Sequence, residues 1–196
     1  SNPKNSVFDS TGPAIEGIEL KINNPDKKTG EGAIWAKGPK VMKGYFKEPE
    51  MTREVLTPDG WFKTGDLGAL NHKNYLYIKG RLKNMIIGAS GENIYPEEIE
   101  SIINNSRFVV ESLVVQQKGK LVALVHINME ELEKKYQTLK QDMTKQVEIK
   151  VDEVLHELQS YVNSQVNKFS QIQKVVLQSA PFQKTATLKI KRFLYI

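Results

Sequence analysis

The sequence contains no cysteine among its 196 residues. A disulfide framework, a zinc–thiolate site and a thiol nucleophile are therefore excluded. Uninterrupted apolar runs are also short, and none approaches the ~18 residues that a membrane-spanning helix needs. We therefore expect a cytoplasmic protein, with peripheral contact with a membrane left open.

Arginine is scarce beside lysine, although the formal net charge is +5. Proteins that read base sequence rely on the guanidinium fork, so this balance favours diffuse attraction to small anions, and we expect no nucleic-acid partner. A surface selected for solubility would give the same net charge. The four arginines are Arg53, Arg81, Arg107 and Arg192.

The chain is long enough for one large domain or two small ones, and it can bury roughly 70% of its unfolded surface. Its first part is rich in short β-type segments between turns, at Gly17–Ile22, Gly32–Ala36 and Tyr75–Lys79. One helix, Glu48–Leu56, interrupts them, with Pro49 in its first turn.

After Arg81 the pattern mixes helix and strand, so the fold class is α+β. Pro96–Asn104 predicts a helix, because a proline opens it and acidic residues follow in the first turns. The remaining segments read as extended, and the second and third form a hairpin across Lys118-Gly119; they are Lys83–Ile87, Phe108–Gln116, Lys120–Ile127, Val175–Leu177 and Leu188–Ile190.

A long helical stretch lies at about residues 129–170, where apolar residues recur at steps of three, four or five and keep one face apolar. Most of this stripe is expected to pack in the core. An alternative is that it docks on a partner or a membrane, which would make the chain a non-catalytic interaction module. The stripe consists of Leu139, Met143, Val147, Val151, Val154, Leu158, Val162, Val166 and Phe169.

Three motifs carry side chains suited to chemistry: Gly60–Gly68, Gly80–Glu100 and Lys184–Arg192. A turn can hold the Asp66 carboxylate, and Lys189 offers a point charge that suits a phosphate. Taken singly, each has an ordinary structural explanation: a turn aspartate, a turn glycine, a surface ion pair or a charged strand edge. Their joint occurrence changes that balance.

The three motifs, in this order, resemble the adenylate-forming (AMP-binding) superfamily of acyl-CoA synthetases, luciferases and peptide-synthetase adenylation domains. Gly30–Pro39 and Val41–Tyr45 add a further match. Leu188, where most of the superfamily has glycine, and the Lys-Ile-Lys-Arg that follows are similar to the long-chain fatty acyl-CoA synthetase branch. The resemblance covers about residues 11–196.

The resemblance implies two structural parts. Residues 1–81 correspond to the β-rich end of a large N-terminal domain that binds ATP and the acyl group. Residues 82–196 correspond to the mobile C-terminal lid domain, with its hinge at Lys83 and the helical stretch as an insertion. Asn84 departs from the family pattern, in which an acidic residue commonly follows the hinge. The chain lacks the phosphate loop and the acyl tunnel, so its main partner is the missing N-terminal domain of the same polypeptide.

The resemblance also implies a role for each motif residue. Asp66 grips the ribose hydroxyls of ATP, Arg81 contacts ribose or phosphate, and Ile78 lies against the nucleotide. Gly91 lets the pantetheine arm of CoA pass. Lys189 stabilises the attack of the substrate carboxylate on the α-phosphate of ATP.

The implied reaction is that of an acid–thiol ligase, which converts a long-chain fatty acid, ATP and CoA to acyl-CoA, AMP and diphosphate through an acyl-adenylate. Mg²⁺ accompanies the ATP, and this chain supplies no metal ligands of its own. We expect no tightly bound cofactor and no activity from the chain alone. The alternative within this class is a synthetase for another carboxylic acid.

Overall fold

The computed structural model describes residues 7–135 and 143–196. The chain divides into two compact units, Ser1–Asn84 and Met85–Ile196. The predicted boundary lies three residues earlier, because the short 3₁₀ turn η2 (Leu82–Asn84) stays with the first unit. The existence of two units does not show that one rotates against the other, so the hinge role of Lys83 stays a prediction.

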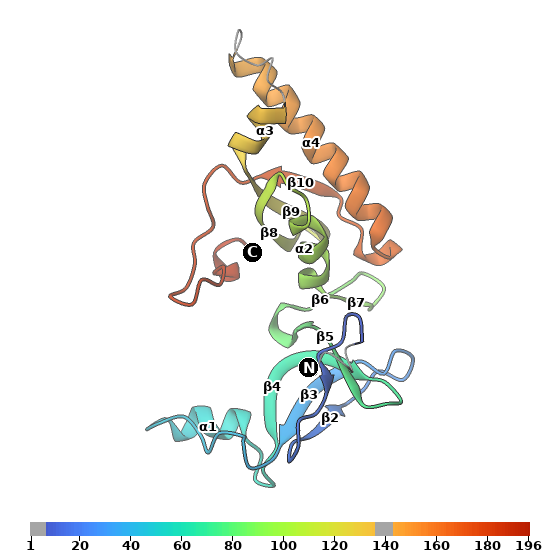
Figure 1. Ribbon diagram of the computed structural model, residues 1–196, viewed down its shortest axis with the longest axis vertical. Helices are drawn as coiled ribbons and strands as arrows, with labels where there is room; N and C mark the ends of the chain where they lie inside the picture. Colours follow the sequence, from blue (N-terminus) through green and yellow to red (C-terminus); the bar gives the residue numbers. More distant parts are fainter. Residues whose placement is uncertain (1–6, 136–142) are drawn as a thin grey trace. The chain divides into compact units, whose positions relative to one another are not determined.

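The first unit is built on an antiparallel sheet of strand order β1-β5-β4-β3-β2 (Figure 1). The helix α1 (Pro49–Val55) begins with proline. Proline lacks an N–H, and this costs nothing at the first position because the N–H groups of the first turn have no intrahelical acceptor. The strands predicted from sequence are found with ends shifted by at most two residues. The strands are β1 (Gly12–Pro13), β2 (Glu19–Asn23), β3 (Gly32–Lys37), β4 (Phe62–Leu70) and β5 (Tyr75–Arg81).

Strand β4 was not expected, and the prediction that Asp66 sits in a turn is wrong. Two glycines obscured the strand: Gly65 has φ +79°, and Gly68 lies at a register shift against β5. A Cβ at Gly68 would lie 2.3 Å from the carbonyl oxygen of Tyr77. Glycine therefore lets β4 pass close to its neighbour, and Asp66 lies within a strand.

The second unit contains a sheet of strand order β10-β9-β8. β8 (Val109–Gln117) and β9 (Lys120–Ile127) form the predicted antiparallel hairpin. Lys118 and Gly119 both have positive φ, as a two-residue turn of type I′ requires. β10 (Lys174–Leu177) lies parallel to β9, since the chain returns to the sheet through the helices.

Helices cover one face of this sheet, and the C-terminal segment covers the other (Figure 1). The helices are α2 (Pro96–Asn104), α3 (Met129–Lys135) and α4 (Met143–Gln165), and α2 has the predicted bounds. Successive strand residues point to opposite faces, so Val114 packs toward the helices while Leu113 and Val115 pack toward Phe182. Burial on both faces explains the nearly continuous apolar runs of β8 and β9.

The apolar stripe of the helical stretch is mainly core, as expected. Val151, Val154, Leu158 and Val162 of α4 are buried against the sheet. Phe169 does not belong to the stripe, because α4 ends at Gln165 and Phe169 is 54% exposed in the 3₁₀ turn η3 (Lys168–Ser170). Leu139 and the side chains of Met143 and Val147 lie outside what the structure describes.

Two predicted extended segments are corrected. Most of Lys83–Ile87 is not a strand; only β6 (Ile86–Ile87) is, and it pairs with β7 (Asn93–Ile94). Leu188–Ile190 forms one isolated bridge rather than a strand. A short 3₁₀ turn, η4 (Arg192–Leu194), follows it. Within residues 7–135 and 143–196, no helix combines the length and apolar character needed to cross a membrane.

Replacing Ile103 by alanine should lower the free energy of unfolding by about 2 to 5 kcal/mol, because the side chain is fully buried between α2 and the sheet. Ile87→Ala is the control, since Ile87 is 63% exposed in the same unit. Urea unfolding followed by circular dichroism measures both. Equal losses for the two variants would show that α2 does not pack as described.

Candidate active site

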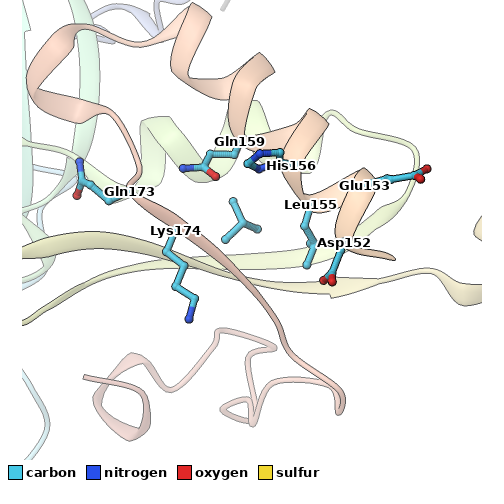
Figure 2. Close-up of a pocket in the computed structure, with 8 residues that line it drawn as sticks. Asp152, Glu153, Leu155, His156, Gln159, Gln173 and Lys174 are labelled. Atoms are coloured by element: carbon cyan, nitrogen blue, oxygen red, sulfur yellow. The ribbon is translucent and has the colours of Figure 1, made fainter. Parts of the chain in front are cut away.

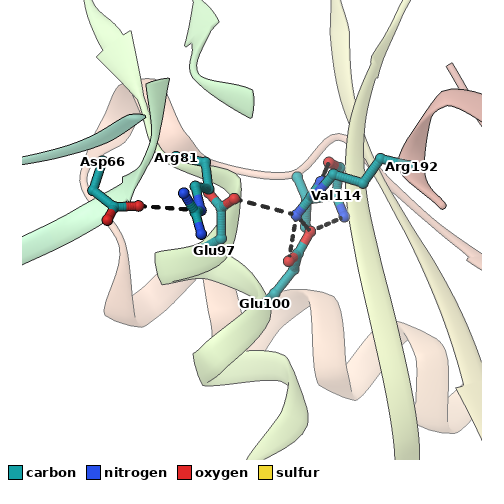
Figure 3. Close-up of polar contacts among 6 residues, drawn as sticks. All are labelled: Asp66, Arg81, Glu97, Glu100, Val114 and Arg192. Atoms are coloured by element: carbon teal, nitrogen blue, oxygen red, sulfur yellow. Dashed lines mark hydrogen bonds and ion pairs between the residues drawn. The ribbon is translucent and has the colours of Figure 1, made fainter. Parts of the chain in front are cut away.

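Asp66 and Arg81, singled out separately in the sequence, face each other on neighbouring strands β4 and β5. The Arg81 Nε lies 3.1 Å from Asp66 Oδ1 (Figure 3). The Arg81 Nη1 donates a hydrogen bond of 3.3 Å to the Thr64 carbonyl. The side chains are 29% and 50% exposed, so the pair adds little to stability. A carboxylate has about four acceptor positions, so Asp66 can also accept from vicinal hydroxyls.

Ile78 lies three residues before Arg81 on the same strand, opposite Gly68, and its side chain is 48% exposed. An exposed β-branched side chain beside a polar pair provides a flat apolar contact. Ile78, Asp66 and Arg81 therefore offer both polar and apolar contacts on neighbouring strands.

Gly91 lies at an exposed turn between β6 and β7. Its N–H donates to the Gly88 carbonyl at 3.0 Å, and Gly88 N–H donates to the Glu92 carbonyl at 2.8 Å. Gly91 has φ +85°, while a Cβ there would meet nothing within 4 Å. Backbone conformation, rather than crowding inside this unit, accounts for the glycine. Lys83 is exposed in η2.

Lys189 lies on a tight hairpin of the C-terminal segment. Lys184 and Ile190 bridge its base, and the Thr185 N–H donates to the Lys189 carbonyl at 2.8 Å. The Lys189 N–H donates in turn to Thr185 Oγ1 at 3.2 Å. Leu188 adopts φ +60°, a conformation that costs a residue with a Cβ about 1 to 2 kcal/mol. This left-handed backbone explains why a glycine suits the position.

The chain before the hairpin is held by one carboxylate, that of Glu111 on β8. Its Oε1 accepts a hydrogen bond of 3.0 Å from the Phe182 N–H, and its Oε2 pairs with the Lys184 ammonium. The Phe182 ring is buried against the sheet and meets the Tyr195 ring edge-on at 5.1 Å. Tyr195 also accepts a hydrogen bond of 2.9 Å from the Gln183 N–H through its hydroxyl.

The chain after the hairpin is held by Arg192, which reaches through to α2 (Figure 3). Its Nη2 contacts both oxygens of Glu100 at 2.5 Å, and its Nη1 donates to the Val114 carbonyl at 3.1 Å. Arg192 and Glu100 are 17% and 13% exposed. Burial raises the pKa of the Glu100 carboxyl above its ordinary value, and the Arg192 guanidinium and the Val114 N–H offset part of that rise.

The hairpin therefore presents Lys189 outward from a fixed base. Lys189 is exposed, and no ion pair of its ammonium occurs within residues 7–135 and 143–196. Its neighbours Lys184 and Arg192 are both engaged with carboxylates. The sequence motif identified Lys189 but gave no sign of Glu100 and Glu111, which lie about 80 or more residues earlier in the chain.

A hollow of about 530 Å³ opens between α4 and β10 (Figure 2). None of the candidate residues lines it, and its wall mixes carboxylates, amides and a lysine without a common charge. It does not supply the site for a triphosphate. The lining residues are Asp152, Glu153, Leu155, His156, Gln159, Gln173, Lys174 and Val175. No cluster of three or more His, Asp or Glu side chains suited to a metal occurs in the part of the chain that the structure describes.

Comparison with known proteins identifies the second unit. The family model for the AMP-binding enzyme C-terminal domain matches residues 83–194. The chain belongs to the AMP-binding enzyme family. The match includes Lys83, Gly91 and Lys189, while Asp66, Ile78 and Arg81 precede it.

Curated relatives include fatty-acid ligases. The chain is 48% identical over 94 residues to the long-chain-fatty-acid–CoA ligase heimdall of Drosophila melanogaster, a match that covers 48% of this chain and 14% of that protein. It is 37% identical over 146 residues to a chloroplastic long-chain-fatty-acid–[acyl-carrier-protein] ligase of Arabidopsis thaliana, covering 66% of this chain and 20% of the relative. The matches thus cover a fifth or less of the length of these relatives.

Solved structures agree on the fold. The O-succinylbenzoate coenzyme A synthetase of Bacillus subtilis in complex with AMP matches with a TM-score of 0.73 at 26% identity, covering 95% of this chain and 35% of that one. The same enzyme in complex with ATP and a magnesium ion gives 0.72 at 27% identity. The α+β assignment and the family resemblance are confirmed.

Replacing Arg192 by alanine should cost about 3 to 5 kcal/mol of unfolding free energy, because the Glu100 carboxylate is left buried without a cation. Glu100→Ala should cost less, because Arg192 keeps the Glu97 carboxylate at 3.9 Å. The double variant should cost much less than the sum of the two single losses. Lys150→Ala, which removes the more exposed pair with Glu153, is the control and should cost less than about 1 kcal/mol. Additive losses in urea unfolding would mean that the pair is not formed.

Proposed function

We propose that this chain is the C-terminal part of an ATP-dependent, AMP-forming acid–thiol ligase that joins a long-chain fatty acid to CoA. Its residues serve the two halves of that reaction, formation of the acyl-adenylate and transfer of the acyl group to the thiol. The family match and the identities to fatty-acid ligases support the proposal. The remainder of the enzyme, with the acyl pocket, belongs to an N-terminal domain that would be the main partner.

The observation that carries the proposal is the exposed ammonium of Lys189 on a hairpin whose base is fixed. At ~4 Å from a phosphate oxygen, with an effective dielectric constant near 20, its attraction is about 4 kcal/mol. At ~20 Å through water the attraction falls to roughly 0.2 kcal/mol. Movement of the second unit would therefore determine whether the Lys189 ammonium attracts the α-phosphate strongly or hardly at all.

In the first half-reaction, Asp66 would accept hydrogen bonds from the ribose hydroxyls, Arg81 would contact ribose or phosphate, and Ile78 would lie against the nucleotide. Lys189 would approach the α-phosphate and stabilise the negative charge that grows as the fatty acid carboxylate attacks. The bond from the α-phosphorus to the bridging oxygen breaks, and diphosphate leaves. Mg²⁺ would arrive with the ATP and neutralise phosphate charge, because the developing charge lies on phosphate oxygens.

In the second half-reaction, the second unit would turn about Lys83 and withdraw Lys189. The Gly91 turn would then lie along the path of the pantetheine arm, and the CoA thiol would attack the acyl carbonyl and release AMP. The exposed position of Gly91 supports this role, because no side chain of its own unit lies within 4 Å of where its Cβ would be.

Long-chain fatty acids are proposed as substrates on the basis of the relatives and of Leu188. The acyl pocket, which would give direct evidence, lies outside this chain. A synthetase for another carboxylic acid is the alternative. The structure gives no support to a docking module built on the α4 stripe, since the stripe residues Val151, Val154, Leu158 and Val162 are buried in their own unit. We also propose a cytoplasmic location, with which the lack of cysteine is compatible, and peripheral contact with a membrane.

Lys189→Ala in the full-length enzyme should lower the rate of acyl-adenylate formation by about 10² to 10³, the loss typical of removing one transition-state donor. Thioester formation from supplied acyl-adenylate should persist, because Lys189 is withdrawn in that step. Diphosphate release and acyl-CoA formation measure the two halves separately. Equal loss of both would contradict the role assigned to Lys189.

The 196-residue chain alone should release no diphosphate from ATP and palmitate, because it lacks the phosphate loop and acyl pocket that position the reactants. The assay is a coupled measurement of diphosphate, with the full-length enzyme as the positive control. Turnover by the isolated chain would show that its two units suffice for adenylation.

A further inference from the structure

We infer that Glu111 and Lys184 are positioning residues for Lys189, and that their ion pair serves the adenylation half-reaction in particular. The inference rests on the function proposed above. It concerns residues that act through the hairpin backbone and do not themselves touch the nucleotide.

Glu111 is placed to act in this way because it belongs to the sheet. It lies on β8, pairs in register with His126 of β9, and has a side chain only 12% exposed. One of its oxygens receives the Phe182 N–H and the other receives the Lys184 ammonium. A single carboxylate thus fixes both the main chain before the hairpin and the Lys184 side chain at the base of the hairpin.

The path from Lys184 to Lys189 is short. Thr185, the residue after Lys184, donates its N–H to the Lys189 carbonyl and accepts the Lys189 N–H on its hydroxyl. A shift of Lys184 therefore carries the backbone of Lys189 with it. The other foot of the hairpin remains tied by Arg192 to Glu100.

Only half of the reaction should depend on this arrangement. A lysine has a flexible side chain, so its ammonium can occupy a range of positions around the backbone. The position of the backbone therefore determines what fraction of these positions lies near the α-phosphate. A displacement of ~1 Å can cost up to about 10² in rate at a reacting centre. Since Lys189 is withdrawn before thioester formation, the second half-reaction should not sense the position of the hairpin.

The experiment compares Lys184→Gln with Lys184→Arg in the full-length enzyme. Glutamine removes the charge, whereas arginine restores a cation for Glu111. For Lys184→Gln, kcat of diphosphate release should fall about tenfold while KM for ATP and the rate of thioester formation from supplied acyl-adenylate stay within about twofold. Lys184→Arg should recover most of the loss.

Lys150→Gln is the matched control, because Lys150 forms an ion pair with Glu153 on α4 and its side chain is 34% exposed, close to the 37% of Lys184. It should leave both half-reactions unchanged. Lys189→Ala, measured in parallel, reports separately on the proposed function.

Four outcomes overturn the inference. Lys184→Gln could leave kcat of diphosphate release unchanged while Lys189→Ala lowers it, which would remove the positioning role but keep the proposed function. Parallel loss of both half-reactions would indicate a general structural role. No recovery in Lys184→Arg would show that the ion pair is not the cause. If Lys189→Ala leaves diphosphate release unchanged, the proposed function fails and the inference fails with it.

Discussion

The buried contact between the Arg192 guanidinium and the Glu100 carboxylate determines where the C-terminal segment lies. Without it, two other sets of contacts would hold the chain after β10. One set is the apolar packing of Phe182, Ile190 and Tyr195 against the sheet, and the other is the hydrogen bond and ion pair of Glu111 with Phe182 and Lys184. Apolar contacts are not directional, whereas the Arg192 guanidinium is held in orientation by two nitrogens, Nη2 on the Glu100 carboxylate and Nη1 on the Val114 carbonyl. Because the pair is buried, its two charges depend on each other. The Lys189 hairpin lies between this contact and the Glu111 contact.

Within a dozen residues, the C-terminal segment combines residues that are fixed to the second unit with residues that are exposed. Phe182, Lys184 and Arg192 are engaged with the body of the second unit, while Leu188 is 79% exposed and Lys189 is also exposed. Under the proposed function, Lys189 meets a phosphate in one step and leaves it in another, so its ammonium has to be accessible and yet delivered to a defined place. A hairpin with two fixed feet meets both requirements, and the lysine stem supplies the final reach.

Local patterns in the sequence were sufficient for most elements of the fold. Pro96 and the acidic residues after it define α2, Lys118-Gly119 defines the hairpin turn, and the Val154, Leu158 and Val162 spacing defines the buried face of α4. Strand β4 was missed because glycines interrupt its apolar pattern, and its register shift depends on the neighbouring strand. The parallel pairing of β10 with β9 could not be predicted locally either, since it joins segments about 50 residues apart.

The candidate site shows the same division. The motifs identified Asp66, Arg81, Gly91 and Lys189 one by one, but that Asp66 and Arg81 are partners follows only from the pairing of β4 and β5. Glu100 has the appearance of an ordinary acidic residue near a helix start, and Glu111 that of a polar interruption in a strand. Their roles depend on contacts with residues more than 70 positions away. Sequence patterns thus locate the candidate residue Lys189, and the tertiary contacts explain how its hairpin is held.

The most direct test is the chemical reactivity of Lys189 in the full-length enzyme, measured by mass spectrometry after brief treatment with an amine-reactive reagent. The account predicts that Lys189 reacts readily in the free enzyme, and that ATP with a non-reactive fatty acid analogue slows its labelling but not that of the exposed Lys118. An unreactive Lys189 in the free enzyme, or no protection by ATP, would contradict it.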